Sequence, residues 1–151
     1  MSKGPEANFW NTMRKSLPKK TFATRIENKH GGGIPDVHVI WNGIPFWVEL
    51  KVSSGNRIKL TPNQVAWNAA YWARGGLNFI LVKDPVSKLL LLFDGCHGSE
   101  ALDAGIKSGC CSRYGSFDEL FSALRPRMVD RLSESCGFQP SLAASGAESA
   151  Y

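Results

Sequence analysis

The sequence predicts a mixed α/β fold, with a β-sheet flanked by helices, from three observations. Residues 34–52 contain two β-rich runs on either side of a short turn signal. A helical stretch follows at 61–74, opened by threonine and proline and closed by two glycines. Apolar runs at 77–82 and 89–93 then have the length and composition of buried strands. Together these segments predict a hairpin joined through a helix to further strands.

The turn signal is Asn42-Gly43, the dipeptide that best supplies the positive φ angles of a two-residue hairpin loop. A two-residue loop fixes the register, so we expect Val37 to face Val48 and Asp36 to face Glu49. Side chains alternate between the two faces of a strand. One face of the predicted hairpin is therefore apolar and suited to a core: Val37, Val39, Trp41, Ile44, Phe46, Val48, Leu50 and Val52. The opposite face carries Asp36, His38, Trp47, Glu49 and Lys51.

The segments on either side of the hairpin complete the predicted domain. Residues 8–16 and 21–29 are expected to form helices, the second ended by a triple glycine that marks a turn rather than a phosphate-binding loop. The connection from the hairpin through the next helix to the following strand resembles a right-handed crossover. We expect a single domain over 1–132, with its core at 20–94.

The C-terminal part of the chain has weaker signals. Residues 95–113 are rich in Gly, Cys and Ser and are expected to be irregular. A capping signal of Ser and Glu three residues apart at 116–119 predicts a helix that ends near 132. Residues 133–151 have the composition of a disordered tail.

Charge is unevenly distributed along the 151 residues. Residues 1–88 hold 13 Lys and Arg against five Asp and Glu, whereas residues 89–151 hold five against eight. A basic first part suits a polyanion such as DNA, because each cation set against a phosphate releases counterions. A solvated basic surface that aids solubility explains the same charge.

The cysteines and hydropathy exclude other classes. Cys96, Cys110, Cys111 and Cys136 lack paired CxxC spacing, which argues against a zinc site or disulfide framework and favours reduced thiols. The longest apolar run, 89–93, is too short to span a bilayer, and residues 1–6 are polar, unlike a signal peptide. We expect a soluble cytoplasmic protein.

The polar face of the hairpin carries the chemistry. Two carboxylates directly opposite on neighbouring strands have Cβ atoms about 5 Å apart, a repulsive arrangement that a cation relieves. Carboxylate oxygens are hard ligands suited to Mg²⁺, for which Mn²⁺ substitutes. Lys51 lies two residues beyond Glu49 on the same face, within reach of a bound phosphate. Asp36, Glu49 and Lys51 therefore predict metal-assisted phosphodiester hydrolysis.

These residues carry a family resemblance. Pro35-Asp36, followed after twelve residues by Glu49-Leu50-Lys51, resembles the PD-(D/E)xK nuclease superfamily, although this short pattern also arises by chance. With Arg25-Ile26-Glu27-Asn28, Gly32-Gly33-Ile34 and Thr61-Pro62-Asn63-Gln64, it is most similar to the VRR-NUC and archaeal-type Holliday junction resolvase branch. The likeness covers about residues 20–83 and implies a restriction-endonuclease-like mixed β-sheet flanked by helices.

The resemblance also implies roles for individual residues. Asp36, Glu49 and the Leu50 carbonyl would bind the metal, and Lys51 would be catalytic. Glu27 would approach from the preceding helix, and Gln64 would support the site. A solvated helix residue explains Glu27 equally well, and a capping box with Thr61 explains Gln64.

Other polar and aromatic residues have structural explanations beside functional ones. His38 could donate to phosphate, but packing against Trp47 is the more common role of such a histidine. Trp67, Tyr71 and Trp72 on the central helix are expected in the core rather than as surfaces for base stacking. Phosphate contacts are expected from Lys19, Lys20, Arg57 and Lys59.

The function expected is a Mg²⁺-dependent DNA endonuclease. The chain shows no zinc finger or helix-turn-helix for reading sequence, which favours branched or junction DNA recognised by shape. A junction resolvase would act as a homodimer, because two symmetric strands need two active sites. The alternatives are a nicking, repair or restriction-type nuclease on linear or damaged duplex, and a DNA-binding module without catalysis.

Overall fold

The computed structural model describes residues 4–27 and 32–136. Its centre is a six-stranded sheet in which the strands are neighbours in chain order. The strands are β1 (Phe22–Arg25), β2 (Val37–Trp41), β3 (Ile44–Val52), β4 (Asn78–Lys83), β5 (Leu90–Asp94) and β6 (Cys111–Tyr114). Only β3 and β4 are parallel. The mixed sheet and its helices confirm the predicted α/β class.

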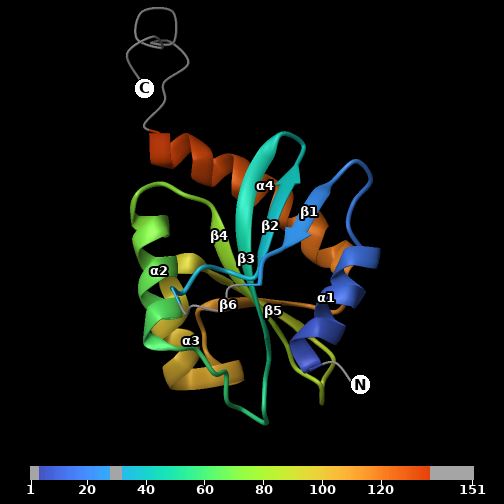
Figure 1. Cartoon of the computed structure of the whole chain (residues 1–151), viewed down its shortest axis with the longest axis vertical. Helices are drawn as coiled ribbons and strands as arrows, with labels where there is room; N and C mark the ends of the chain where they lie inside the picture. The colour runs from blue at the N-terminus through green and yellow to red at the C-terminus, as the bar shows by residue number, and fades with distance from the viewer. Residues whose placement is uncertain (1–3, 28–31, 137–151) are drawn as a thin grey trace, which may run out of the picture.

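Helices cover both faces of this sheet (Figure 1). They are α1 (Pro5–Lys15), α2 (Pro62–Ala73), α3 (Gly98–Ala104) and α4 (Phe117–Cys136), with short 3-10 turns η1 (Gly95–His97) and η2 (Gly105–Lys107). Figure 1 shows α4 passing behind β2 and β3, while α2 and α3 lie together at one side of the sheet. Within the described ranges, no helix is long and apolar enough to cross a membrane.

The buried strands alternate between two hydrophobic clusters. On β4, Phe79 and Leu81 join the cluster that contains Phe9 and Met13 of α1 and residues of α4. Ile80 and Val82 face the second cluster, with Ala101 of α3, while Val65 of α2 packs against it. Each cluster is continuous because successive side chains point to opposite faces. The β2–β3 hairpin contributes to the first cluster with Val37, Val39, Trp41, Phe46, Val48 and Leu50.

The structure confirms the predicted hairpin register. Val37 pairs with Val48 and Trp41 with Ile44 across the turn. Asn42 and Gly43 both have positive φ, at 52° and 77°, as a tight two-residue turn requires.

Helix α2 also begins as predicted. The Thr61 hydroxyl accepts from the Gln64 N–H, and the Gln64 side chain accepts from the Thr61 N–H. This reciprocal capping satisfies two backbone donors at the helix start. The helix joins β3 to the parallel strand β4, as expected for a crossover.

The predicted helix at 21–29 is wrong. Residues 22–25 form β1, which pairs antiparallel with β2 from Phe22↔Ile40 to Arg25↔Val37. The β-branched and aromatic residues of this segment complete their backbone hydrogen bonds on the edge of β2, and this pairing outweighs a weak helical pattern. The remainder of the predicted helix lies partly at 28–31, outside the described residues.

The C-terminal part is more regular than predicted. Residues 95–113 form η1, α3, η2 and most of β6. Helix α4 starts near the predicted capping signal and continues beyond 132 to Cys136. The rest of the predicted tail, 137–151, lies outside the described residues. Cys96, Cys110 and Cys111 are free thiols.

The aromatic residues of α2 are less buried than predicted. Trp72 packs against the first cluster and lies under the guanidinium of Arg131, 4.0 Å from its ring centre. Trp67 is half-buried and Tyr71 is 36% exposed, with their rings stacked at 4.9 Å. Neither ring belongs to the two hydrophobic clusters, so the prediction that they lie in the core is wrong for Trp67 and Tyr71.

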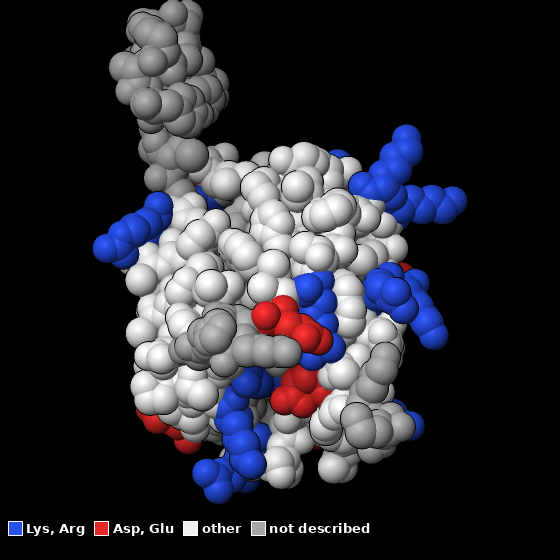
Figure 2. All heavy atoms as spheres, viewed as in Figure 1, with Lys and Arg blue, Asp and Glu red and all other residues white. Residues whose placement is uncertain are grey.

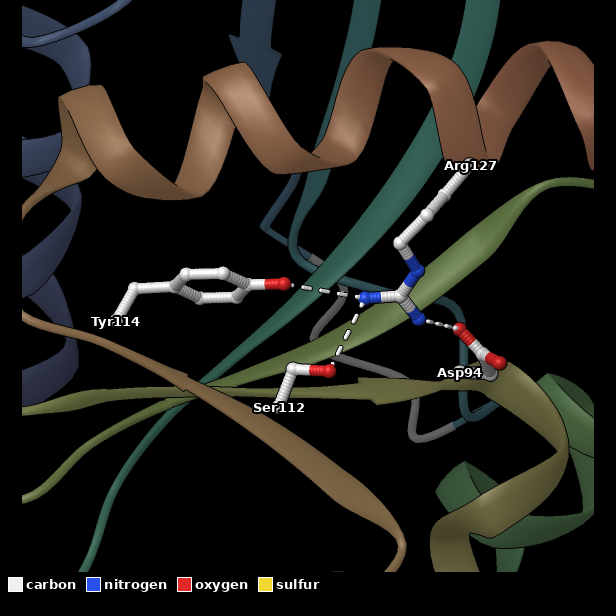
Figure 3. A network of polar contacts seen from close by, with 4 residues as sticks. All are labelled: Asp94, Ser112, Tyr114 and Arg127. Carbon is white, nitrogen blue, oxygen red and sulfur yellow. Dashed lines mark hydrogen bonds and ion pairs between the residues drawn. The ribbon is translucent and has the colours of Figure 1, made fainter.

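Arg127 connects helix α4 to the last two strands of the sheet (Figure 3). Arg127 forms an ion pair of 2.7 Å with Asp94 at the end of β5. The same guanidinium donates to Ser112 and Tyr114 of β6, both at 3.4 Å. These contacts connect the last helix with the last two strands on the side of the first cluster.

We expect Arg127→Met to lower the free energy of unfolding by about 1–2 kcal/mol, because Asp94 loses a charged hydrogen-bond partner that is partly shielded from water. Urea denaturation measures the change. Arg125→Met, at an exposed position of the same helix, serves as the matched control and should change stability by less than about 0.5 kcal/mol. Equal effects of the two substitutions would contradict a fastening role for Arg127.

Candidate active site

Two acidic side chains meet at the open end of the hairpin, as predicted. Asp36 directly precedes β2, and its carboxylate accepts a hydrogen bond of 3.0 Å from the Leu50 N–H of β3. Its backbone carbonyl accepts from the Ile26 N–H after β1, at 2.6 Å. Asp36 is thereby held between the two neighbouring strands, with its carboxylate next to the backbone that carries Glu49.

Glu49 is the most unusual residue of the sheet. Its side chain is only 1% exposed, and no N–H or O–H donor of another described residue pairs with either carboxylate oxygen. A buried, unpaired carboxylate is costly in its charged form. Burial, and next a hydrogen bond with the adjacent Asp36 carboxyl and the charge of that group, raise the pKa of Glu49 to about 9, while the positive charge of Lys51 partly opposes this. Near neutral pH, Glu49 is therefore protonated when no metal cation is bound beside it.

Lys51 completes the predicted trio. It lies two residues after Glu49 on β3, on the same side of the strand, and is half-buried. Figure 2 shows red Asp and Glu atoms near the centre of the face turned away from α4, with blue Lys and Arg side chains around them, while Glu49, only 1% exposed, lies below the surface. A negative centre with a basic surround suits a cation and a phosphate together.

The donor set fits a hard divalent cation. The described residues hold no group of three or more His, Cys, Asp and Glu side chains able to bind a metal. Mg²⁺ does not need one, since it is commonly held by one or two carboxylates and keeps several waters or phosphate oxygens. Asp36 and Glu49 together supply the one or two carboxylates that such a cation needs. The Leu50 carbonyl stays a prediction.

The start of α2 closes the other side of the site. A cavity of about 220 Å³ is lined by Asp36, Gln64 and neighbouring residues of 26–36 and 61–64. Gly33, with φ of 80°, allows the close approach, because a Cβ there would lie 2.2 Å from the Asn63 carbonyl oxygen. Gln64 thus lies near Asp36 while its side chain also caps α2. The two explanations of this residue are compatible.

Glu27 differs from its expectation. It follows β1 in an extended segment, so the predicted approach from a helix is wrong. Its side chain is exposed, and the cavity beside Asp36 is lined by Ile26 rather than Glu27.

The expected DNA contacts divide into two locations. Arg57 and Lys59 line a cavity of about 330 Å³ together with Lys51, next to the acidic pair. Lys19 lines a different hollow with Trp41 and Phe121, which belong to the cluster on the opposite face of the sheet. Lys20 is exposed beside it in sequence. Of the four Lys and Arg residues expected to contact DNA, Arg57 and Lys59 line a cavity together with a residue of the candidate site.

His38 has the structural contact that its position favoured. Its ring lies 4.7 Å from that of Trp47 across the β2–β3 pair. The sequence did not predict the further contact between Trp47 and Trp67, whose ring centres lie 5.9 Å apart. The alternation that put Trp47 on the polar face was the signal that could have revealed it.

Comparisons with known proteins find a weak structural similarity but no sequence match. No protein-family model matches this sequence, and no curated protein matches it. Among solved structures, the fold is similar to Hjc of Archaeoglobus fulgidus, a Holliday junction resolvase from an archaeal hyperthermophile. The TM-score is 0.45 at 12% identity, over 77% of this chain and 89% of that chain. A likeness this weak assigns neither a family nor an activity.

The raised pKa of Glu49 predicts a pH-dependent stability of the metal-free protein. From the ordinary value of 4.5 to about 9, the folded state binds one more proton than the unfolded state. This group therefore makes the free energy of unfolding fall as pH rises through that window. Glu49→Gln should remove the effect, so that the variant in EDTA is more stable than the wild type at pH 8 and similar to it at pH 4.

The measurement is urea denaturation across pH, repeated with Mn²⁺. Mn²⁺ should stabilise the wild type more than Glu49→Gln, because an amide binds a hard cation more weakly than a carboxylate does. Glu100→Gln, at an exposed position on α3, should keep the wild-type pH dependence. Identical pH profiles for the wild type and Glu49→Gln would disprove the assignment.

Proposed function

We propose that this chain is a divalent-metal-dependent DNA endonuclease that hydrolyses phosphodiester bonds with Asp36, Glu49 and Lys51. The observation that carries the proposal is the buried Glu49 carboxyl group, which has the Asp36 carboxyl as its polar neighbour just before β2 and a lysine on the same side of β3. A fold stabilised only for packing would not retain such a carboxylate. The resemblance of Pro35-Asp36 and Glu49-Leu50-Lys51 to PD-(D/E)xK nucleases gives independent sequence support.

The proposed reaction divides the work among these residues. Asp36 and Glu49 would hold Mg²⁺ or Mn²⁺, with the Leu50 carbonyl as a further ligand. The bound cation would lower the pKa of a water and screen negative charge at phosphorus. Lys51 would orient the attacking water or donate to a non-bridging phosphate oxygen as negative charge develops there. Arg57 and Lys59 would hold a neighbouring phosphate.

The proposed substrate is branched DNA such as a four-way junction, and the proposed assembly is a homodimer. The basic cavity beside the site supports phosphate binding without base reading. Two symmetric cuts in a junction require two active sites. A panel of linear, flap, forked and four-way DNA tests the selectivity. Equal cleavage of all of them would favour a nicking, repair or restriction-type nuclease.

Lys51→Ala should reduce the turnover of Mg²⁺-dependent cleavage of a four-way junction by about 100-fold or more, because it removes a charge that acts on the transition state. Binding affinity should change by less than about threefold. Lys88→Ala, on the exposed β4–β5 turn, is the matched control and should cleave normally. Absence of cleavage by the wild type with Mg²⁺ and Mn²⁺ would instead indicate a DNA-binding module without catalysis.

Arg57→Ala and Lys59→Ala should each reduce the slope of log affinity against log salt by about 1, because each removes one phosphate contact. Fluorescence anisotropy with labelled duplex DNA in EDTA measures the slope. Lys19→Ala should leave it unchanged, since Lys19 adjoins the opposite face of the sheet. A lower slope for Lys19→Ala with none for Arg57→Ala would place the DNA elsewhere.

A further inference from the structure

An uncharged patch lies beside the candidate active site, on the same face of the sheet. Phe22 pairs with Ile40 between β1 and β2, and His38 pairs with Trp47 between β2 and β3. Paired residues share a face, and this one is opposite to the face that Val37 and Val39 bury in the core. We call Phe22, His38, Ile40 and Trp47 the apolar face.

This face is open to solvent at its far end. Phe22 is 58% exposed and Ile40 is 38% exposed, whereas His38 and Trp47 are half-buried. Near the site, Trp47 is held between His38 on one side and Trp67 of α2 on the other. Ring contacts at both sides restrict the rotation of Trp47, so this part of the apolar face is rigid.

The apolar face is continuous with the catalytic residues. Trp47 and Glu49 are two residues apart on one side of β3, about 7 Å along the strand. Lys51 lies the same distance further on, next to the cavity that Arg57 and Lys59 line. A substrate phosphate at Glu49 and Lys51 would therefore have a basic cavity on one side and the apolar face on the other.

The chemistry of the two sides differs accordingly. Phosphates bind Arg and Lys, whereas an apolar and aromatic surface binds the flat faces of nucleobases. In a continuous duplex those faces are covered by neighbouring base pairs. They become accessible where base stacking is interrupted, as at a branch or an end.

We propose that the apolar face binds unstacked nucleobases next to the cleaved phosphate. The proposal rests on the proposed nuclease function and gives it a physical source of selectivity. DNA with interrupted stacking gains contacts with Phe22, Ile40 and Trp47 that a continuous duplex does not offer.

The test measures binding without cleavage, in the Lys51→Ala background with Mg²⁺. The ligands are a four-way junction with hairpin-capped arms, a hairpin-capped duplex and a blunt-ended duplex, so that branch and end are separated. Each carries 2-aminopurine at the branch, the middle or the end. Phe22→Ser/Ile40→Ser is the test variant, because both side chains are exposed and should tolerate serine.

The double variant should lose about tenfold in affinity for the junction, with little change for the capped duplex. Quenching of 2-aminopurine fluorescence at the branch should weaken together with the affinity. A loss of affinity for the blunt-ended duplex alone would mean that the apolar face binds the bases at DNA ends. Val86→Ser, at an 86% exposed apolar residue of the β4–β5 turn, is the control and should behave as the parent protein.

Three outcomes would overturn the inference. Equal loss on junction and capped duplex would mean general DNA binding, and no loss on any ligand would mean that the face does not contact DNA. A shift in sedimentation of the double variant with unchanged DNA preference would identify a contact between copies of this chain. Cleavage by the wild type is scored separately, so failure of the nuclease proposal remains distinguishable.

Discussion

The register of the β2–β3 hairpin is the constraint on which the rest of the structure depends. The turn at Asn42 and Gly43 puts Val37 opposite Val48 and sends both into the core. Because strand side chains alternate, a slip of one residue would put Glu49 and Lys51 into the hydrophobic cluster and expose the valines. The same tight turn thus determines both the packing of the sheet and the side on which the charged residues gather.

The sheet tolerates an unfavourable group at one position. Glu49 is buried, no N–H or O–H donor of the other described residues pairs with its carboxylate oxygens, and burial and Asp36 raise its pKa against the opposing charge of Lys51. The side-chain amide of Asn78, also buried in the sheet, by contrast donates to both the backbone and side chain of Asn68. A buried carboxyl group with an electrostatic cost, next to residues that line cavities, is typical of a site that is completed by a ligand. This contrast gives the proposed metal site its physical basis.

The two faces of the sheet differ in how completely helices cover them. One carries the larger hydrophobic cluster and the Arg127 contacts that hold α4 in place. The other is only partly covered by α2 and α3, which leaves the acidic pair, the basic cavity and the apolar face adjacent to one another. The well-packed face stabilises the sheet. The partly covered face can therefore retain a buried carboxylate and exposed apolar side chains where a substrate would lie.

Local sequence determined the hairpin, its register and the capped start of α2, because turn residues and alternation act between near neighbours. It therefore also brought Asp36, Glu49 and Lys51 to one face. Only the tertiary structure decided that residues 22–25 form an edge strand, since that choice depends on hydrogen bonds offered by β2. The complete burial of Glu49, the location of Lys19 on the other face and the exposed position of Glu27 likewise depend on which distant elements pack together. Contacts between residues far apart in the chain leave no periodic pattern in the sequence, so those features appear only when the layers assemble.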